Sequence, residues 1–422
     1  MLHPMDDFPK IELENVPYYK EGYYWVSPLN YDEDCRKGLP KTAKTHDVTL
    51  RDGEQLPGVT FTEDERVRIA ECINDTGAYR MEAGMPIVSD VQFNALKRIS
   101  HANFKTKIFA FARAVDKDIQ RCIDGGAEGV VVEHCVNPYT CKYAYGLTPA
   151  TLVERLTKSF KMVKDNGLYC TFMGWDWFRT PVEFSKWLIT ECLNEVKFDG
   201  LTIVDTYGAS TPDAIEKMIR MFKTWFPELS LEFHGHNDMG WGQCSAIAAL
   251  RGGADVIHTA MNSLGERAGN VPSEEFAVTA QVLYGVDLGM NIDRLYPSCE
   301  VVSKIAQMPI GLQKPIIGDR LYQVENGVAT HIAAKVGELG VNPVVFSIMP
   351  ELIGKPGGTE ILLGKNSGRN AVTLEIEKLG LPEANEDQIK EILAGIKAEG
   401  LVTKSLVSDS QFLTIYNKVM GK

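Results

Sequence analysis

A strand–helix rhythm runs through residues 44–261 of this 422-residue chain and constrains its fold more than any other feature. Short runs rich in β-branched and other apolar residues recur eight times, and stretches with helical periodicity separate them. Several runs are apolar at nearly every position, which is typical of strands covered on both faces, as in parallel sheets. The runs span residues 44–50, 79–83, 107–112, 129–134, 168–173, 200–206, 230–236 and 255–261.

Eight strand–helix units predict an α/β fold of the (β/α)8 TIM-barrel type. A six-stranded doubly wound sheet is the alternative, but it leaves two strands unexplained, and no G-x-G-x-x-G segment follows the first run. Thr62 and Glu65 have the spacing of a capping box, which predicts the start of the first barrel helix. We expect an N-terminal extension at 1–43, a TIM-barrel catalytic domain at 44–290 and C-terminal helical subdomains at 291–422.

Charge and composition narrow the possible partners. The formal net charge is −12 without a block of like charge, and such a surface repels nucleic acid and anionic membranes. The chain has no apolar run long enough to span a membrane and no signal-peptide pattern at its N-terminus. Its nine cysteines are irregularly spaced, which favours free thiols in a reducing compartment. We expect a cytoplasmic protein that acts on small molecules and binds neither nucleic acid nor membranes.

Two of the predicted strands end in charged residues that are suited to a reaction in which negative charge develops. Arg51 and Asp52 follow the first run and offer a cation beside a metal-ligating carboxylate, although a structural ion pair in a turn is the alternative. Gln55, in the same segment, is a candidate for substrate binding. Glu82 ends the second run and is placed to brace Arg51, because a buried carboxylate needs a cation.

His234 and His236 indicate a metal site at the end of the seventh run. Residues i and i+2 of a strand share a face, so both imidazoles point the same way. Asn270, in a glycine-containing segment after the eighth run, adds a neutral oxygen, and Asp52 adds a carboxylate. This mixed set suits Mg²⁺, Mn²⁺ or Zn²⁺ with positions open for a chelating substrate, and such an ion acts as a Lewis acid.

Asp205 and Thr206 follow the sixth run. The hydroxyl of Thr206 is a candidate to bind a substrate carboxylate, and the carboxylate of Asp205 to take a proton. The alternative is that both residues cap the next turn, a role that Asp and Thr favour.

Taken together, these segments resemble the DRE-TIM metallolyase superfamily, and most closely its acetyl-CoA-condensing branch of isopropylmalate, homocitrate and citramalate synthases. Two further segments, ENGVATH (325–331) and LGKNSGRNAV (363–372), resemble the C-terminal subdomains of those synthases. The matching barrel segments are TLRDGEQ (49–55), EAGMP (82–86), VDTYG (204–208), FHGHND (233–238) and NSLGERAGN (262–270).

The resemblance implies a Claisen-type condensation of an acyl-CoA, with acetyl-CoA expected, and a 2-oxo acid. It implies that Arg51 stabilises an oxyanion and that Thr206 holds the keto-acid carboxylate. His331 matches a histidine that reaches the active site of a neighbouring subunit in the synthases, so a homodimer or larger assembly is expected. The implied metal ligands are Asp52, His234, His236 and Asn270.

The chain departs from the homocitrate synthases at the end of the fifth run. Thr171, Met173 and Trp175 stand where those enzymes carry Arg, Ser and Glu. Met173 and Trp175 are therefore candidates to contact an acceptor with an apolar or uncharged tail. If a cation is supplied from elsewhere, Lys142 and Arg179 are the nearest candidates in sequence. In the C-terminal segments, Val345 replaces a catalytic Tyr, and Asn366 and Asn370 replace two histidines.

Two other functions are compatible with these residues. One is an aldol or retro-Claisen lyase of the hydroxymethylglutaryl-CoA lyase type, in which Asp205 is the acid or base. The other is a non-catalytic metal-binding protein. Thiol release that needs both an acyl-CoA and an oxo acid distinguishes the synthase from these two.

Overall fold

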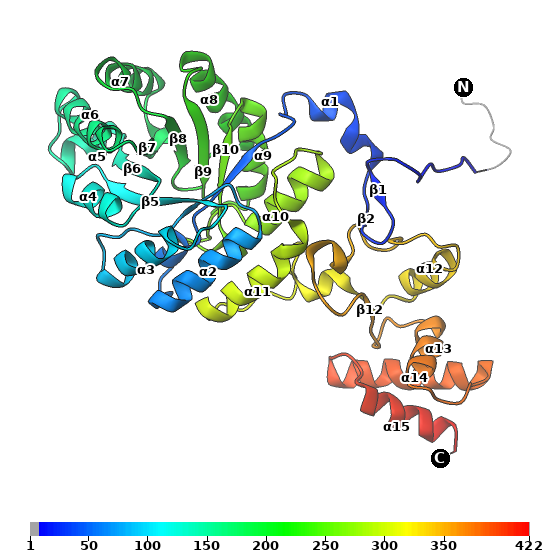
Figure 1. Ribbon diagram of the computed structural model, residues 1–422. Helices are drawn as coiled ribbons and strands as arrows, with labels where there is room; N and C mark the ends of the chain where they lie inside the picture. The colour runs from blue at the N-terminus through cyan, green and yellow to red at the C-terminus, as the bar shows by residue number, and fades with distance from the viewer. Residues whose placement is uncertain (1–7, 422) are drawn as a thin grey trace. The chain divides into compact units, whose positions relative to one another are not determined.

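Eight parallel strands close into a barrel in the computed structural model, which describes residues 8–421 (Figure 1). Each strand overlaps one of the eight predicted runs, so the predicted TIM barrel is confirmed. In order around the barrel, the strands are β10 (Val256–Thr259), β3 (Lys44–Asp47), β4 (Arg80–Glu82), β5 (Lys107–Arg113), β6 (Gly129–Cys135), β7 (Tyr169–Trp175), β8 (Gly200–Asp205) and β9 (Ser230–Gly235).

Helices connect the strands and cover the outside of the barrel (Figure 1). Helix α2 begins where the capping box predicts, because Glu65 N donates to the Thr62 hydroxyl at 3.4 Å and Thr62 N donates to the Glu65 carboxylate at 2.8 Å. The helices of the barrel are α2 (Glu63–Asp75), α3 (Asp90–Ser100), α4 (Asp116–Asp124), α5 (Pro138–Tyr143), α6 (Pro149–Asp165), α7 (Val182–Glu195), α8 (Pro212–Trp225), α9 (Gly242–Gly252) and α10 (Ser273–Val278).

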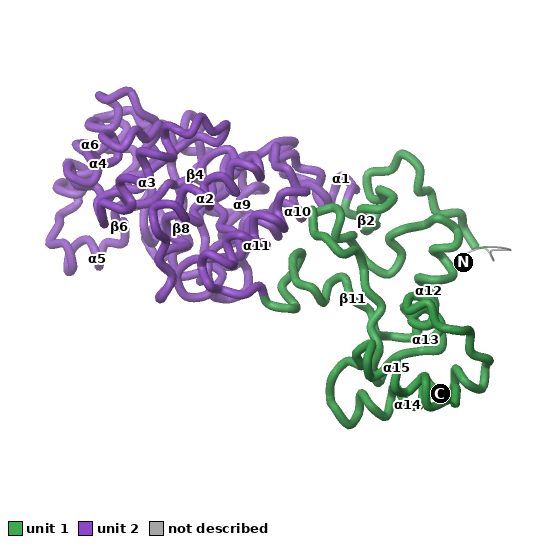
Figure 2. The backbone as a smooth tube through the Cα atoms, turned by 60° about the horizontal axis from the view of Figure 1, so that its bottom comes forward, with its two compact units in different colours: residues 1–30, 311–422 green, residues 31–310 purple. Residues whose placement is uncertain are grey.

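The chain forms two compact units (Figure 2). The barrel unit comprises residues 31–310 and includes α11 (Leu295–Ala306), which packs against α2. The other unit combines residues 1–30 with residues 311–422. These units are defined by internal contacts, and the domain boundaries expected after residues 43 and 290 stay predictions.

In the second unit, the tyrosine-rich N-terminal segment pairs with residues far along the chain. Strands β1 (Tyr19–Lys20) and β2 (Tyr24–Trp25) form a hairpin, and Trp25 N donates to Ser347 O at 3.0 Å. Helices α13 (Arg369–Lys378), α14 (Glu386–Thr403) and α15 (Asp409–Val419) share a core that includes Phe412 and Tyr416. Within residues 8–421, no helix combines the length and the apolar character needed to cross a membrane.

Candidate metal centre and substrate cavity

Three of the four predicted metal ligands meet at the C-terminal mouth of the barrel. One carboxylate oxygen of Asp52, Oδ2, lies 3.1 Å from His234 Nε2 and 3.3 Å from His236 Nε2. Ligand atoms at right angles around a small divalent ion lie about 3 Å apart, because each is roughly 2.1 Å from the ion. The three side chains are at most 6% exposed, and Asp52 Oδ2 and His236 Nε2 have no hydrogen-bond partner among the described residues. The arrangement fits a divalent metal.

The protonation states of these residues also suit a metal. Burial lowers the pKa of His234 to about 3, so its imidazole is neutral and has a free lone pair. Burial by itself raises the pKa of Asp52, but Arg51 and the two imidazoles bring it well below its usual value. The carboxylate is therefore ionised at neutral pH.

Asn270 lies beside His236 because a tight glycine loop returns the chain to the barrel mouth. It pairs with His236 through an isolated β-bridge. Its Nδ2 donates to Leu264 O at 2.9 Å, while its buried Oδ1 has no hydrogen-bond partner among the described residues. Gly269 has φ +86°, and a Cβ there would overlap the carbonyl oxygen of Ser263. Asn270 thus presents an oxygen without a hydrogen-bond partner among the described residues, on a segment that pairs with His236.

Arg51 is fixed by two carboxylates and an aromatic ring. Its Nε donates to Glu82 at 2.6 Å, and its Nη1 lies 3.3 Å from Asp52. Its guanidinium carbon lies 4.6 Å from the centre of the Phe111 ring. At the cavity, its Nη1 lies 3.5 Å from Gln55 Oε1 and its Nη2 lies 3.9 Å from Met173 Sδ. The side chain is therefore oriented before any substrate arrives.

Glu82 is fully buried and does not line the cavity. Besides Arg51, it lies 3.1 Å from His46 Nε2. Burial raises its pKa, but Arg51 and His46 outweigh that effect and bring it below its usual value. The structure therefore places Glu82 as the expected brace for Arg51, without access to a substrate.

A cavity of about 280 Å³ opens beside Arg51 and the three metal-ligand candidates. Gln55, Met173, Trp175 and Thr206 all line it, so the structure brings together the residues predicted to bind substrate. The Thr206 hydroxyl accepts a hydrogen bond from Asp176 N at 2.9 Å, which leaves its own hydrogen available for a ligand carboxylate.

Asp205 does not line this cavity. Its carboxylate accepts hydrogen bonds from Ala209 N and Ser210 N, both at 3.1 Å. Burial raises the pKa of Asp205. The structure thus shows the turn-capping arrangement that was the alternative to proton transfer.

Glu133 and Arg113 line the cavity and were not singled out from the sequence. Glu133 lies in β6 beside Met173 in β7, and its carboxyl has no hydrogen-bond or ion-pair partner among the described residues. Burial raises its pKa. Arg113 makes two hydrogen bonds to Asp118, at 2.7 and 3.1 Å. Glu133 could have been found from the sequence by its position. It is a carboxylate near the end of the run 129–134, and residues two apart in a strand share a face, so Glu133 lies on the same face as Val131.

The remaining predicted residues lie elsewhere. Arg179 makes two hydrogen bonds to Asp176, at 2.7 and 2.8 Å, and neither Arg179 nor Lys142 lines the cavity. Besides Arg51, the cation that lines the cavity is Arg113. His331 is exposed on α12 (Gly327–Gly337) of the second unit, with its Nδ1 3.0 Å from Asn370 Nδ2.

Comparison with known proteins agrees with the resemblance of the motifs. The chain is 31% identical over 399 residues to homocitrate synthase AksA of Methanothermobacter thermautotrophicus, covering 94% of this chain and 98% of that protein. It is also 31% identical over 387 residues to the 2-isopropylmalate synthase of Methanocaldococcus jannaschii, covering 91% of this chain and 73% of that protein.

Solved structures share the barrel. A hydroxymethylglutaryl-CoA lyase from Bacillus subtilis matches with a TM-score of 0.58 and 17% identity, over 64% of this chain and 96% of that one. This likeness bears on the fold alone. The family model described as HMGL-like matches residues 42–302, which include the whole barrel and every predicted metal ligand. The chain belongs to the HMGL-like family.

Proposed function

We propose that this protein is an acyltransferase that condenses an acyl-CoA, acetyl-CoA in the first instance, with a 2-oxo acid. One observation carries the proposal: Asp52, His234 and His236 converge beside Arg51 at a cavity lined by Thr206. Sequence relatives also support the proposal, because two proteins that align with more than 90% of this chain are named homocitrate synthase and 2-isopropylmalate synthase.

Asp52, His234, His236 and Asn270 would hold a divalent metal. When bound, the ion supplies a Lewis acid for the oxo-acid carbonyl. The four residues carry one formal negative charge between them, which leaves the site electropositive toward a chelating anion when a divalent ion is present. Mg²⁺, Mn²⁺ and Zn²⁺ all accept such a ligand set, so metal analysis is needed to choose among them.

Four side chains of the protein have separate roles in the proposed reaction. Thr206 donates a hydrogen bond to the carboxylate of the oxo acid, with Gln55 beside it. Glu133 accepts a proton from the methyl group of acetyl-CoA, because it is the cavity carboxyl that lacks a partner. Arg51 stabilises the enolate oxygen through its Nη1 and Nη2 groups, whose long contacts to Gln55 and Met173 a substrate oxygen would replace. The enolate carbon attacks the oxo-acid carbonyl carbon, the C=O π bond opens, and its oxygen takes up the proton held by Glu133. Water then cleaves the C–S bond of the thioester, which gives a carboxylate and free CoA thiol.

The expected acceptor has an apolar or uncharged tail. Met173, Trp175 and Phe111 are apolar residues of the cavity lining, and burying an apolar group against such side chains contributes about 1.5–3 kcal/mol. A dicarboxylate would instead have to use Arg113, which already pairs with Asp118.

A coupled free-thiol assay tests the function. CoA release should require acetyl-CoA, an oxo acid and a divalent metal together, and pyruvate or 2-oxoisovalerate should give a higher kcat/KM than 2-oxoglutarate or oxaloacetate. Acetyl-CoA formation from a single hydroxyacyl-CoA would favour a lyase instead. A preference for the dicarboxylates would disprove the apolar acceptor and direct attention to Arg113.

We further propose a homodimer or larger assembly in the cytoplasm. His331 is exposed on the second unit, and its role in the synthases that the motifs resemble is to serve a neighbouring subunit. Light scattering at assay concentration tests the assembly, and cell fractionation tests the location.

A further inference from the structure

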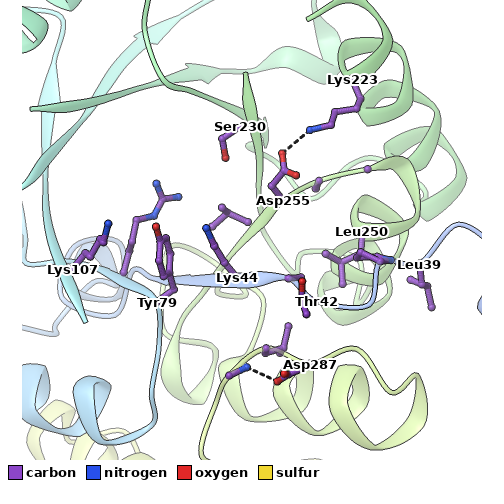
Figure 3. Close-up of a pocket in the computed structure, with 18 of the residues that line it drawn as sticks. Leu39, Thr42, Lys44, Tyr79, Lys107, Lys223, Ser230, Leu250, Asp255 and Asp287 are labelled. Carbon is purple, nitrogen blue, oxygen red and sulfur yellow. Dashed lines mark hydrogen bonds and ion pairs between the residues drawn. The ribbon is translucent and has the colours of Figure 1, made fainter. Parts of the chain in front are cut away.

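A second cavity, of about 850 Å³, opens at the N-terminal mouth of the barrel, at the opposite end of the strands from the metal centre (Figure 3). Because the strands are parallel, their first residues gather at this mouth. The neighbouring strands β3, β4 and β5 begin with Lys44, Arg80 and Lys107, and all three line the cavity. Three cationic side chains thus start on three adjacent strands, in a lining that also contains Lys223 and the carboxylates of Glu128, Asp255 and Asp287.

Lys44 and Lys107 face each other across one aromatic ring. Their ammonium nitrogens lie 4.3 and 5.4 Å from the centre of the Tyr79 ring, and Figure 3 shows all three side chains at the cavity. Burial raises the pKa of Tyr79, but the two lysines more than offset this effect and lower it. The two ammonium groups therefore act on the same small region of the cavity.

The carboxylates around the cavity are already engaged. Asp255 accepts from Lys223 at 2.8 Å, Asp287 from Gly289 N at 2.8 Å, and Glu128 from Ile108 N at 2.7 Å. Arg80 lies 2.7 Å from Glu232, a buried carboxylate inside the barrel. Of the four cationic residues described around this cavity, Arg80 pairs with Glu232 and Lys223 with Asp255, whereas Lys44 and Lys107 form no ion pair with the described residues.

We propose that this cavity is a binding site for a small dianion, either a dicarboxylate or a phosphate. Two ammonium groups without an ion-pair partner match two negative charges. Arg80 lies beneath them, 2% exposed, with its charge already balanced by Glu232. Tyr79, Tyr169 and Phe109 supply apolar walls, so a ligand with a short carbon skeleton is accommodated. This site is separate from the proposed condensation and does not depend on it.

Isothermal titration of the full-length protein at low ionic strength tests the proposal, with succinate and inorganic phosphate as separate probes. Binding of either probe should weaken about tenfold or more in the double variant Lys44→Gln/Lys107→Gln, because two charge pairs are lost. The matched control Lys158→Gln/Lys161→Gln removes two exposed lysines of α6 and should bind like the wild type. Binding should also persist in Arg51→Ala, which separates this site from the metal centre.

The two probes distinguish the sources of the ligand. Binding of succinate alone indicates a dicarboxylate, and binding of phosphate alone indicates a phosphate compound. The proposal is overturned if neither probe binds, if binding is unchanged in Lys44→Gln/Lys107→Gln, or if it disappears in Arg51→Ala. Unfolding temperatures of all variants show whether a loss of binding reflects a loss of folding.

Discussion

Arg51 is held in place by groups that do not react. Glu82 accepts from its Nε and Phe111 covers its face, so its remaining N–H groups are oriented toward the cavity. We predict that Arg51→Ala lowers kcat by roughly 10²–10³, the usual loss for one oxyanion-stabilising donor, while metal content measured by mass spectrometry stays unchanged. The exposed Arg98→Ala is the control. Near-normal turnover in Arg51→Ala would exclude the assigned role.

Glu133 provides a test that depends on pH. Because burial raises its pKa, its proton-accepting form is lost as pH falls through a value above that of an ordinary glutamate. We predict that kcat/KM of the wild type declines on the acidic side at this raised pKa. Glu133→Gln should lose roughly 10²–10⁴ in turnover and the acidic decline with it, whereas the exposed Glu154→Gln should keep both. An unchanged acidic decline in Glu133→Gln would assign the base to another group.

The motif residues and Glu133 differ in how visible they are in a sequence. The spacing of His234 and His236 predicts that both side chains lie on the same face of a strand. Arg51 and Asp52 directly follow a predicted strand. Glu133 is one carboxylate in an apolar run, and its importance depends on having no partner, which is a three-dimensional fact. Asp205 shows the reverse case: a residue in a recognisable motif whose carboxylate is used by the backbone of its own turn.

Buried polar and charged side chains lie inside the barrel, although the strands that carry them are mostly apolar in sequence. We call His46, His258, Arg80 and Glu232 the polar column. Register sets His46 beside both His258 and Arg80, and the two imidazoles stack with ring centres 4.3 Å apart. Glu232 lies 3.0 Å from His258 and 2.7 Å from Arg80. The positions of the strands can be predicted from apolar runs and helix-capping residues. Pairing between distant charged residues depends on the register of the strands around the closed barrel, and that register cannot be read from the sequence.

This column makes a prediction about stability. Glu232→Gln should lower the free energy of unfolding by about 3–5 kcal/mol, because it leaves the buried guanidinium of Arg80 without its counter-charge. The double variant Arg80→Met/Glu232→Gln should recover part of that loss, since no unpaired charge remains. Urea unfolding of both variants and of Arg80→Met completes the double-mutant cycle. Additive losses would mean that the two residues do not stabilise each other.

At the scale of the whole molecule, we propose that His331 contributes to catalysis from outside the barrel unit. It belongs to the second compact unit, whereas Arg51 belongs to the barrel unit. The motif resemblance implies that the histidine serves the barrel of a neighbouring subunit, and the N-terminal segment that pairs with residues 342–349 ties the second unit together. The sequence predicted helical subdomains after the barrel, but the pairing of residues 22–25 with residues 342–349 has no local signal and was not predicted.

Mixing two inactive variants tests this arrangement in solution. If His331 acts between subunits, a dimer of one Arg51→Ala chain and one His331→Ala chain contains one site with both residues intact. Random pairing makes half of the dimers mixed, so co-refolded chains should recover roughly a quarter of wild-type activity. If His331 acts within its own chain, every site lacks one residue, and the mixture stays as inactive as its components. The measurement is the turnover of the co-refolded mixture, and each variant refolded alone is the control. Recovered activity shows that His331 acts between subunits, because only a mixed dimer can contain an intact site.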